Sequence, residues 1–399
     1  MPNFRVGARK FRQLALIGAL RSGRQNGFDT KGAGRHNCCE IWPITERDRP
    51  TNNATVAANR KLWGAENGSP DEVQMNSNLP AQSSVGGRDT RPFVSVIIPA
   101  YNAEPTLARA INSVFAQNYP NVEIIVIDDC SKDGTSQIAT GFNRKEIRLL
   151  RHEKNAGECG AMNSGIAIAQ GKYVAFLDAD DEWRPTKLEK QIEALERNPS
   201  AVFATCACEF VGTDGVPYME FGMPPAEFRK KELWRQLLVR SCVAKPCVVA
   251  HLASLKAAGS FDTSLRIAGD QDMWIRLSRL GEVEFIPEFL TVVHDTPHSL
   301  TKVYGRRLAD YLLPMVSRHV ESLRPELTPS EVRSILGERY TSVGRILYVN
   351  GNFWRGLGLI LQGSLQGTKV RENAWYLMTA SPVARSLKQT MKRIGASRA

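Results

Sequence analysis

Two kinds of segment alternate regularly between residues 91 and 206 of this chain. Runs dominated by Val and Ile, such as 94–99 and 122–127, have the nearly continuous apolar character of strands buried on both faces of a sheet. Between them, the segment 106–117 carries apolar residues at the spacing of one helix face. Strands that alternate with helices in this way predict an α/β fold, in which a mostly parallel, Rossmann-like sheet has helices on both faces.

The alternation continues to about residue 304, and helix-forming residues dominate from residue 305 onward. We expect strands over 94–99, 122–127, 147–150, 173–177, 201–206, 247–250 and 289–294, and helices over 106–117, 135–142, 160–169, 184–198, 230–239 and 270–280. In the C-terminal region, 305–399, the expected helices are 306–323, 329–350, 352–362 and 371–379. The segment around Gly351 resembles the turn of a helix–turn–helix pair, and one such pair is too little to indicate a repeat.

The net charge of this chain is unevenly distributed. Its 399 residues include 52 Lys and Arg against 41 Asp and Glu, a formal net charge of +11. Counted by segment, the net charge is +5 over 1–90, −3 over 91–304 and +9 over 305–399. We therefore expect no nucleic-acid groove in the middle segment. The basic C-terminal region predicts peripheral contact with an anionic membrane, and a helical region packed on the core with a basic outer face is the alternative.

Residues 1–90 differ from the rest of the chain. They are rich in Asn, Gly, Arg, Ser and Pro and lack a sustained period, so we expect a disordered N-terminal arm and linker. The segment 9–21 is either an amphipathic surface helix or sequence upstream of the true start codon. Its apolar part is at the short limit for a secretory signal, and no run approaches the roughly 20 residues that span a bilayer. The eight cysteines form no C-x-x-C pair, which is typical of reduced thiols in the cytoplasm.

Acidic residues cluster at the ends of expected strands and at the start of one expected helix. The carboxylates concerned are Asp128, Asp129, Asp178, Asp180, Asp181, Asp270 and Asp272. In open parallel sheets, ligands bind at the edge formed by the carboxyl ends of the strands. Carboxylates gathered on one edge repel each other unless a cation is present. A divalent Mg²⁺ or Mn²⁺ ion that bridges to a phosphate is therefore expected there.

The order of these motifs resembles the inverting family 2 glycosyltransferases of GT-A fold. The motifs are V-S-V-I-I-P-A-Y-N at 94–102, D-D-C-S-K-D-G-T at 128–135, the turns N-A-G at 155–157 and N-S-G at 163–165, D-A-D-D-E-W at 178–183, and G-D-Q-D-M-W at 269–274. The resemblance covers 94–275, roughly half of the chain. It implies a GT-A domain over 91–304, with a nucleotide half at about 91–183 and an acceptor half at about 184–304.

The resemblance also implies roles for single residues. Tyr101 would stack on a uracil ring, Asp129 would accept its N3–H, and the backbone around Pro99 would line the same pocket. Asp180 would bind the metal, with Asp178 on the ribose and metal side, and Asp270 would be the general base. The implied donor-binding set is Pro99, Ala100, Tyr101, Asp129, Asn155, Gly157, Asp178 and Ala179.

Three positions depart from the family pattern. Gly269 stands where the family usually has Glu before the base, so the orientation of Asp270 must come from elsewhere, with Asp272 as the candidate. Met162 stands where the family often has Arg, which removes one diphosphate contact. The segment 293–299 replaces a Y-R-x-H-like sequence, which leaves His294 and His298 either as contacts to the diphosphate or metal or as loop histidines.

The implied function is a metal-dependent inverting hexosyltransferase of bacterial exopolysaccharide or surface-polysaccharide assembly. It would move a sugar from a nucleotide-sugar donor, UDP-hexose, to a glycan or a polyprenyl-diphosphate-linked acceptor. One carboxylate would take the acceptor proton, and a Lewis acid would hold the departing diphosphate. A catalytically weak GT-A scaffold or binding subunit is the alternative, motivated by Gly269 and Met162. We expect a cytoplasmic protein, peripheral on the cytoplasmic face of the inner membrane.

Overall fold

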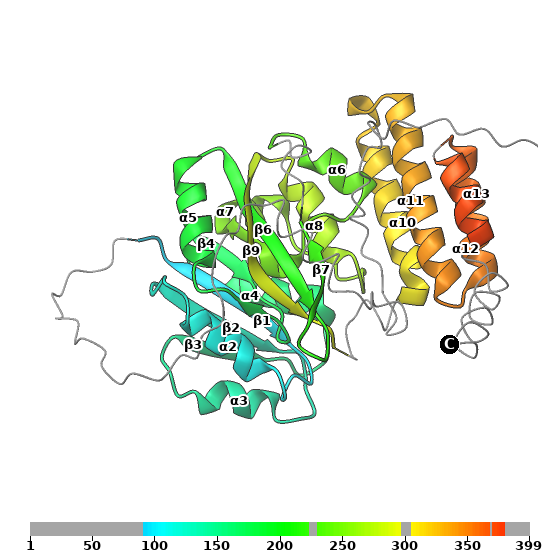
Figure 1. The fold of residues 1–399 in the computed structure, drawn as a ribbon. Coiled ribbons are helices and arrows are strands. Elements are labelled where there is room, and N and C mark those ends of the chain that lie inside the picture. The colour runs from blue at the N-terminus through cyan, green and yellow to red at the C-terminus, as the bar shows by residue number, and fades with distance from the viewer. Residues whose placement is uncertain (1–90, 223–229, 297–304, 368, 380–399) are drawn as a thin grey trace, which may run out of the picture. The chain divides into compact units, whose positions relative to one another are not determined.

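The computed structural model of the chain describes residues 91–222, 230–296, 305–367 and 369–379. The arm expected over 1–90 lies outside the described residues, as does the basic segment 380–399. Within the described part, strands and helices alternate up to β9, and helical elements follow (Figure 1).

The described strands form one nine-stranded sheet, in the order β3-β2-β1-β4-β8-β6-β9-β5 with β7 paired to β6. The strands are β1 (Val94–Ala100), β2 (Val122–Asp128), β3 (Ile147–Arg151), β4 (Tyr173–Phe176), β5 (Glu182–Trp183), β6 (Ala201–Val211), β7 (Pro217–Phe221), β8 (Val249–His251) and β9 (Glu282–His294). Pairing is parallel from β3 to β4 and between β6 and β9. It is antiparallel where β8 joins β4 and β6, and at β5 and β7. The sheet is therefore parallel throughout the half that precedes residue 177 and mixed beyond it.

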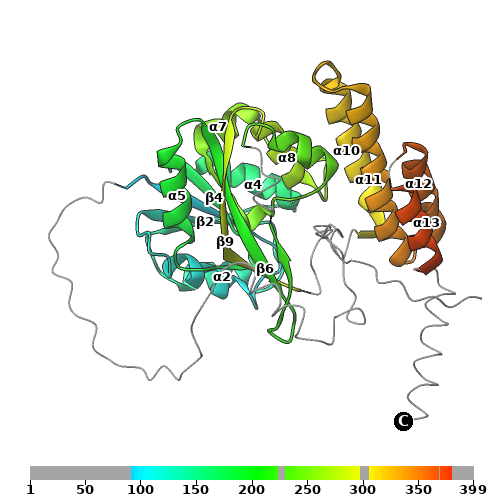
Figure 2. The ribbon, with the colours of Figure 1, turned by 45° about the horizontal axis from the view of Figure 1, so that its top comes forward.

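Helices cover both faces of this sheet. They are α2 (Leu107–Phe115), α3 (Thr135–Gly141), α4 (Gly157–Ile168), α5 (Lys187–Arg197), α6 (Leu233–Val239), α7 (Leu252–Ala258) and α8 (Gly269–Leu277), followed by α10 (Leu308–Ser322), α11 (Pro329–Val349), α12 (Phe353–Leu365) and α13 (Val370–Thr379). Ile97 of β1 and Ile125 of β2 belong to the apolar cluster that includes residues of α4, α6 and α8, whereas Val96 and Ile98 belong to the cluster that includes residues of α2 and α5. Figure 2 shows these two layers on either side of the strands. The alternation of side chains along each strand thus divides the apolar core in two.

The register of the parallel strands places their carboxyl ends at one edge. Ala100 at the end of β1 pairs with Asp128 at the end of β2. Ile97 pairs with Phe176, so the segment after β4 emerges beside the end of β1. The acidic residues that follow β2 and β4 are thereby brought to the same edge, as the sequence predicts.

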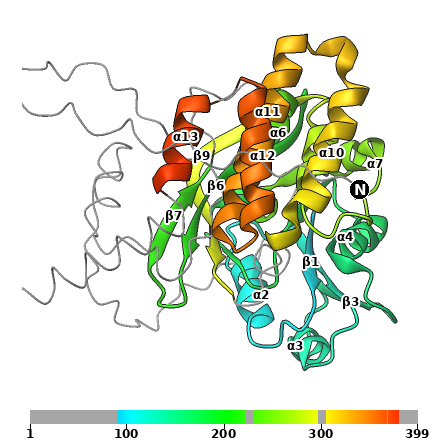
Figure 3. The ribbon, with the colours of Figure 1, turned by 90° about the vertical axis from the view of Figure 1, so that its right-hand side faces the viewer.

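The C-terminal helices lie alongside one another (Figure 3). Buried residues of α10 and α11, among them Met315 and Leu347, belong to the same apolar cluster as Trp274 of α8. Arg339 of α11 is buried and donates hydrogen bonds to the carbonyls of Leu237 and Leu238 in α6. The expected helical C-terminal region is confirmed, and α10 and α11 share a core with the α/β domain.

The structure contains elements that the local pattern did not predict. These are β5, β7, α7 and the first half of β9. Strand β9 begins at Glu282 rather than 289, and it pairs in parallel with β6 from Ala201 onward. Its first seven residues include three Glu and Pro287, which do not read as a buried strand. Long-range pairing, rather than propensity, makes this segment a strand.

Candidate active site

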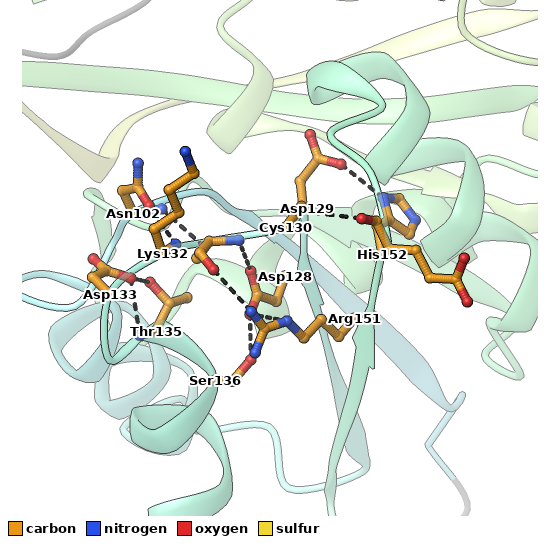
Figure 4. Close-up of polar contacts among 12 residues, drawn as sticks. Asn102, Asp128, Asp129, Cys130, Lys132, Asp133, Thr135, Ser136, Arg151 and His152 are labelled. Carbon is orange, nitrogen blue, oxygen red and sulfur yellow. Dashed lines mark hydrogen bonds and ion pairs between the residues drawn. The ribbon is translucent and has the colours of Figure 1, made fainter.

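The loop after β2 is organised around Asp128 (Figure 4). This fully buried carboxylate accepts the backbone N–H of Ser131 at 2.8 Å and the hydroxyl of Ser136, and the guanidinium of Arg151 lies 3.7 Å away. Burial opposes ionisation, but the hydrogen bonds from Ser131 and Ser136 outweigh it and lower the pKa of Asp128. Asp128 therefore stays ionised and holds the loop in place.

Asp129 joins the end of β2 to the start of α4. Its carboxylate accepts the backbone N–H groups of Ala156 at 2.7 Å and Gly157 at 2.8 Å, at the positive end of the helix. The ring of His152 lies 2.7 Å from the same carboxylate, and the side chain of Asn155 donates to the carbonyl of Asp129 at 3.1 Å. The structure thus brings three residues of the expected donor-binding set together. No local motif marks His152, which lies 23 residues from Asp129 in the chain.

The loop after β1 is tied to the same place. The carbonyl of Ala100, which follows Pro99, accepts the N–H of Asp129 at 2.8 Å. Asn102 accepts the N–H of Lys132 at 2.9 Å and donates its own N–H to Ser131. These bonds leave the ring of Tyr101 half exposed, at 51%. An aromatic face is therefore available to a planar ring at this edge of the sheet.

Left-handed backbone is found at the same edge. Five described non-glycine residues have positive φ, and three of them, Asn102, Cys130 and Ala268, lie here with φ values of 51°, 67° and 64°. Each lies within two residues of an expected site residue. Such conformations cost free energy and are typical of loops whose shape serves a ligand.

The segment after β4 carries three carboxylates. Asp178 and Asp180 are half-buried and flank the buried Ala179, and Asp181 is buried and accepts the backbone N–H of His294 at 3.0 Å. Burial, with the negative charges of Glu158 and Asp180, raises the pKa of Asp178 to about 7. The hydroxyl of Thr296 donates to Asp180 at 2.8 Å.

A lysine that sequence analysis did not identify lies inside this cluster. The ammonium group of Lys245 pairs with Asp178 and with Glu158, and its side chain is only 5% exposed. Burial opposes its charge, but the two carboxylates outweigh burial and raise its pKa. Lys245 comes from the 3₁₀ turn before β8, 87 residues from Glu158. No local motif marks such a residue.

Asp270 lies in the first turn of α8, half-buried beside the start of α4. Burial and the negative charge of Glu158 raise its pKa to about 6. The preceding Gly269 is in contact with Cys159, because a Cβ atom at this glycine would lie 2.3 Å from the Cys159 sulfur. The acidic neighbour of Asp270 is therefore Glu158 of α4 rather than a residue at position 269.

Asp272, the expected orienting residue, has other partners. Its buried carboxylate accepts from the ring of His319 in α10 at 2.8 Å and from Arg276 at 2.8 and 3.0 Å. Burial opposes ionisation, but His319 and Arg276 outweigh it and lower the pKa of Asp272. This contact links α8 to the C-terminal helices. The hydrogen bonds of the Asp272 carboxylate are to His319 and Arg276, so any effect of Asp272 on the orientation of Asp270 would be transmitted by the backbone of the first turn of α8.

Of the two candidate histidines, the structure describes His294 but not His298. The ring of His294 lies 3.2 Å from Glu182, in the strand that follows the acidic segment. It therefore stands at the edge of the carboxylate cluster. His298 lies outside the described residues.

The donor atoms at Asp178 and Asp180 suit a hard divalent cation. Within the described ranges, no group of three or more His, Cys, Asp or Glu side chains is arranged to hold a metal. Mg²⁺ is usually held by one or two carboxylates together with substrate phosphates, which two half-buried aspartates match. Lys245 engages Oδ1 of Asp178, and Thr296 engages Oδ2 of Asp180. Among the described residues, neither Oδ2 of Asp178 nor Oδ1 of Asp180 is in a hydrogen bond or ion pair, in contrast to Oδ1 of Asp178 and Oδ2 of Asp180.

A sheet with carboxylate clusters after β2 and β4, together with an acidic first turn in α8, is the arrangement that the resemblance to the GT-A glycosyltransferases predicts. The profile of the family described as "Glycosyl transferase family 2" matches residues 95–248. The chain is 40% identical over 193 residues to the Bacillus subtilis protein named "Putative teichuronic acid biosynthesis glycosyltransferase TuaG", a match that covers 48% of this chain and 74% of that protein. This chain therefore belongs to glycosyl transferase family 2, and it is an enzyme of the glycosyltransferase class.

Another relative is matched over a shorter stretch. The Escherichia coli protein "UDP-Glc:alpha-D-GlcNAc-diphosphoundecaprenol beta-1,3-glucosyltransferase WfgD" is 44% identical over 106 residues, which are 27% of this chain and 42% of that protein. A solved mannosyltransferase from Pyrobaculum calidifontis, PcManGT, is 18% identical and aligns over 86% of this chain and 87% of its own, with a TM-score of 0.49.

Proposed function

We propose that this enzyme transfers a hexose from a UDP-sugar, with inversion, to a glycan or a polyprenyl-diphosphate-linked acceptor in surface-polysaccharide biosynthesis. The observation that carries the proposal is the position of Asp270. Its half-buried carboxylate, with a pKa of about 6, lies beside the Glu158–Lys245–Asp178 cluster at the carboxyl edge of the sheet. A base on one side and a carboxylate pair on the other are what a direct displacement needs.

The chemistry is a single displacement at the anomeric carbon. Asp270 takes the proton of the acceptor hydroxyl as its oxygen forms a bond to that carbon. The bond from the anomeric carbon to the diphosphate oxygen breaks, and UDP departs with the electron pair. A carboxylate whose pKa is about 6 is ionised at neutral pH and accepts a proton more readily than an ordinary Asp.

Donor binding would fall to the loops after β1, β2 and β4. Tyr101 presents its exposed ring for stacking on uracil, and Asp129 lies at the base of the same loop. Asp178 and Asp180 would hold a Mg²⁺ or Mn²⁺ ion, which would supply positive charge to the diphosphate when bound. The N–H groups at the start of α4 add the positive end of a helix.

The lipid-linked acceptor is supported by one relative's name and by a surface of this chain. The name of the E. coli relative specifies a diphosphoundecaprenol acceptor. Exposed large apolar residues gather on α12 and α13: Trp354, Leu361, Leu365, Val370, Trp375 and Met378. The following residues 380–399 contain five basic and no acidic side chains. Aromatic and aliphatic residues followed in the sequence by basic residues suit the interface of an anionic membrane, and we propose that the apolar face of α12 and α13 meets it.

The same surface supports a proposal for the position of the enzyme at the membrane. None of the described helices combines the length and apolar character that crossing a bilayer requires. We propose peripheral attachment on the cytoplasmic side of the inner membrane, where nucleotide sugars and lipid-linked acceptors meet.

The test is transfer from radiolabelled UDP-hexoses to a polyprenyl-diphosphate-linked sugar in the presence of Mn²⁺, with Asp270→Asn as the variant. We expect the variant to lose about 10²- to 10⁴-fold in kcat, the usual contribution of a general base. UDP binding, followed by calorimetry, is expected to stay within about twofold of the unchanged protein. Turnover that does not depend on Asp270 would contradict the assignment of the base. Absence of turnover with every donor would favour the scaffold alternative.

A further inference from the structure

The ion pair between the buried Lys245 and the half-buried Glu158 joins two residues that neither bind the donor nor act as the base in the proposed reaction. The ammonium of Lys245 pairs with the carboxylates of both Glu158 and Asp178. Glu158 lies in the first turn of α4 and acts electrostatically on Asp270. One lysine thus contacts Asp178, a proposed donor-binding residue, and Glu158, the acidic neighbour of the proposed base.

The backbone that carries Lys245 is held firmly. The carbonyl of the next residue, Pro246, accepts the indole N–H of Trp183 at 2.8 Å and the hydroxyl of Thr291 at 3.3 Å. The carbonyl of Cys247 accepts the side-chain amide of Gln191 at 2.8 Å. Trp183 lies in β5, directly after the acidic segment. The turn before β8 is therefore fixed to the same elements that position Asp178.

The first turn of α4 is equally constrained. The thiol of Cys159 lies 3.6 Å from the carbonyl of Leu265 and fills the space beside Gly269. Burial and the charges of Glu158 and Asp270 raise the pKa of this thiol to about 12, so it stays neutral. Two charged groups shift the pKa of Asp270: Glu158 from α4 raises it, and Lys245 from the turn before β8 lowers it.

We propose that Lys245 is a positioning residue for the transfer reaction: it holds Asp178 by one oxygen, leaves the other oxygen for the donor or its cation, and fixes Glu158 as the carboxylate neighbour of Asp270. This inference rests on the proposed function. Position 269 is a glycine and has no side chain that could orient Asp270 or influence its charge. In this proposal, Lys245 and Glu158 take over both tasks. Removal of the ammonium leaves Glu158 and Asp178 without their counter-charge, and removal of the Glu158 charge relieves repulsion at Asp270.

The test compares Lys245→Met, Lys245→Arg and Glu158→Gln with the unchanged full chain, by the pH dependence of kcat/KM and by KM for the donor. The acid limb is the fall of kcat/KM at low pH as Asp270 becomes protonated. Loss of the ammonium makes this protonation easier, so in Lys245→Met the acid limb is expected to move to higher pH by about one unit. KM for the UDP-sugar is expected to rise several-fold, because Asp178 loses its fixed partner. In Glu158→Gln the acid limb is expected to move to lower pH. Lys245→Arg keeps the charge and is expected to restore the limb of the unchanged enzyme, with a raised KM because its geometry differs.

A purely structural role would lower kcat/KM in every variant and leave the acid limb in place, which would overturn the proposal. Glu158→Gln preserves size and hydrogen bonding, so it decides the question even where Lys245→Met fails to fold. An unchanged enzyme that shows no Asp270-dependent transfer would refute the proposed function. Active variants with unchanged limbs and unchanged donor KM would refute only the role of Lys245.

Discussion

The contact between Gly269 and Cys159 shows how closely two elements approach at the base. A Cβ atom at position 269 would lie 2.3 Å from the Cys159 sulfur, and the next nearest atom, in Leu265, is 3.9 Å away. The sulfur alone therefore excludes a side chain at this position. The glycine that breaks the family pattern and the cysteine of α4 are a complementary pair.

This pair predicts a reciprocal effect of two substitutions. Gly269→Ala is expected to lower the free energy of unfolding by about 1–3 kcal/mol, the usual cost of overpacking. In the background of Cys159→Ala, the same substitution is expected to cost less than about 1 kcal/mol, because the obstructing sulfur is gone. Urea denaturation of the four proteins measures this coupling. Equal costs in both backgrounds would contradict the contact.

The raised pKa of Asp270 predicts the acid limb of the reaction. The base must be deprotonated, and burial with the charge of Glu158 raises its pKa to about 6. Transfer is therefore expected to be constant above about pH 7 and to fall about tenfold per pH unit below about pH 6. Initial rates at low donor concentration between pH 4.5 and 8 measure this limb. A limb near pH 4, the value of an ordinary Asp, would show that burial does not act on this group.

At the scale of elements, α11 and α12 pack through glycines. A Cβ atom at Gly356 would lie 2.4 Å from the backbone nitrogen of Tyr348, and one at Gly363 would lie 2.3 Å from the hydroxyl of Thr341. The backbones of the two helices are thus in direct contact, closer than side chains would permit. The helix–turn–helix pair expected around Gly351 is confirmed, and these glycines are what bring its helices together.

Two glycines of the same helix provide a matched comparison. Gly356→Ala is expected to lower the free energy of unfolding by more than about 1 kcal/mol, because its Cβ would meet backbone atoms that cannot move aside. Gly358→Ala meets no atom within 4 Å and is expected to be neutral or to stabilise by up to about 1 kcal/mol, because alanine favours the helix. Thermal unfolding followed by circular dichroism compares them. A destabilising Gly358→Ala with a neutral Gly356→Ala would refute the packing described.

For the whole molecule, the uneven charge has a structural counterpart. The middle segment is slightly acidic because it gathers the carboxylates of the site, whereas the positive charge lies in the flanks. The face formed by the apolar residues of α12 and α13 adjoins the basic C-terminal segment in the sequence. These features favour a membrane partner over nucleic acid.

The membrane proposal predicts selective binding to vesicles. The full chain is expected to sediment with phosphatidylglycerol vesicles at low salt and to be released at high salt, because the attraction is partly electrostatic. Trp354→Ala and Trp375→Ala are each expected to weaken partitioning about fivefold or more, from lost apolar burial. Leu280→Ala, at an exposed apolar residue outside these helices, is the control and is expected to have no effect. Equal binding to neutral phosphatidylcholine vesicles would contradict the proposal.

The amino-acid sequence is enough to predict the strands β1, β2 and β4, the helices between them and the carboxylates at their ends. Apolar period and turn residues are local signals, and parallel strands bring their carboxyl ends to one edge whatever the rest of the chain does. The tertiary structure alone decided the reversal of β8, the entry of Lys245 between Glu158 and Asp178, the match of Gly269 with Cys159, and the pairing of Asp272 with His319. These contacts join residues far apart in the chain, 47 positions for Asp272 and His319 and 87 for Glu158 and Lys245. Which charges pair and which side chains fit together across such separations depends on how the elements pack, and a periodic sequence pattern does not encode that packing.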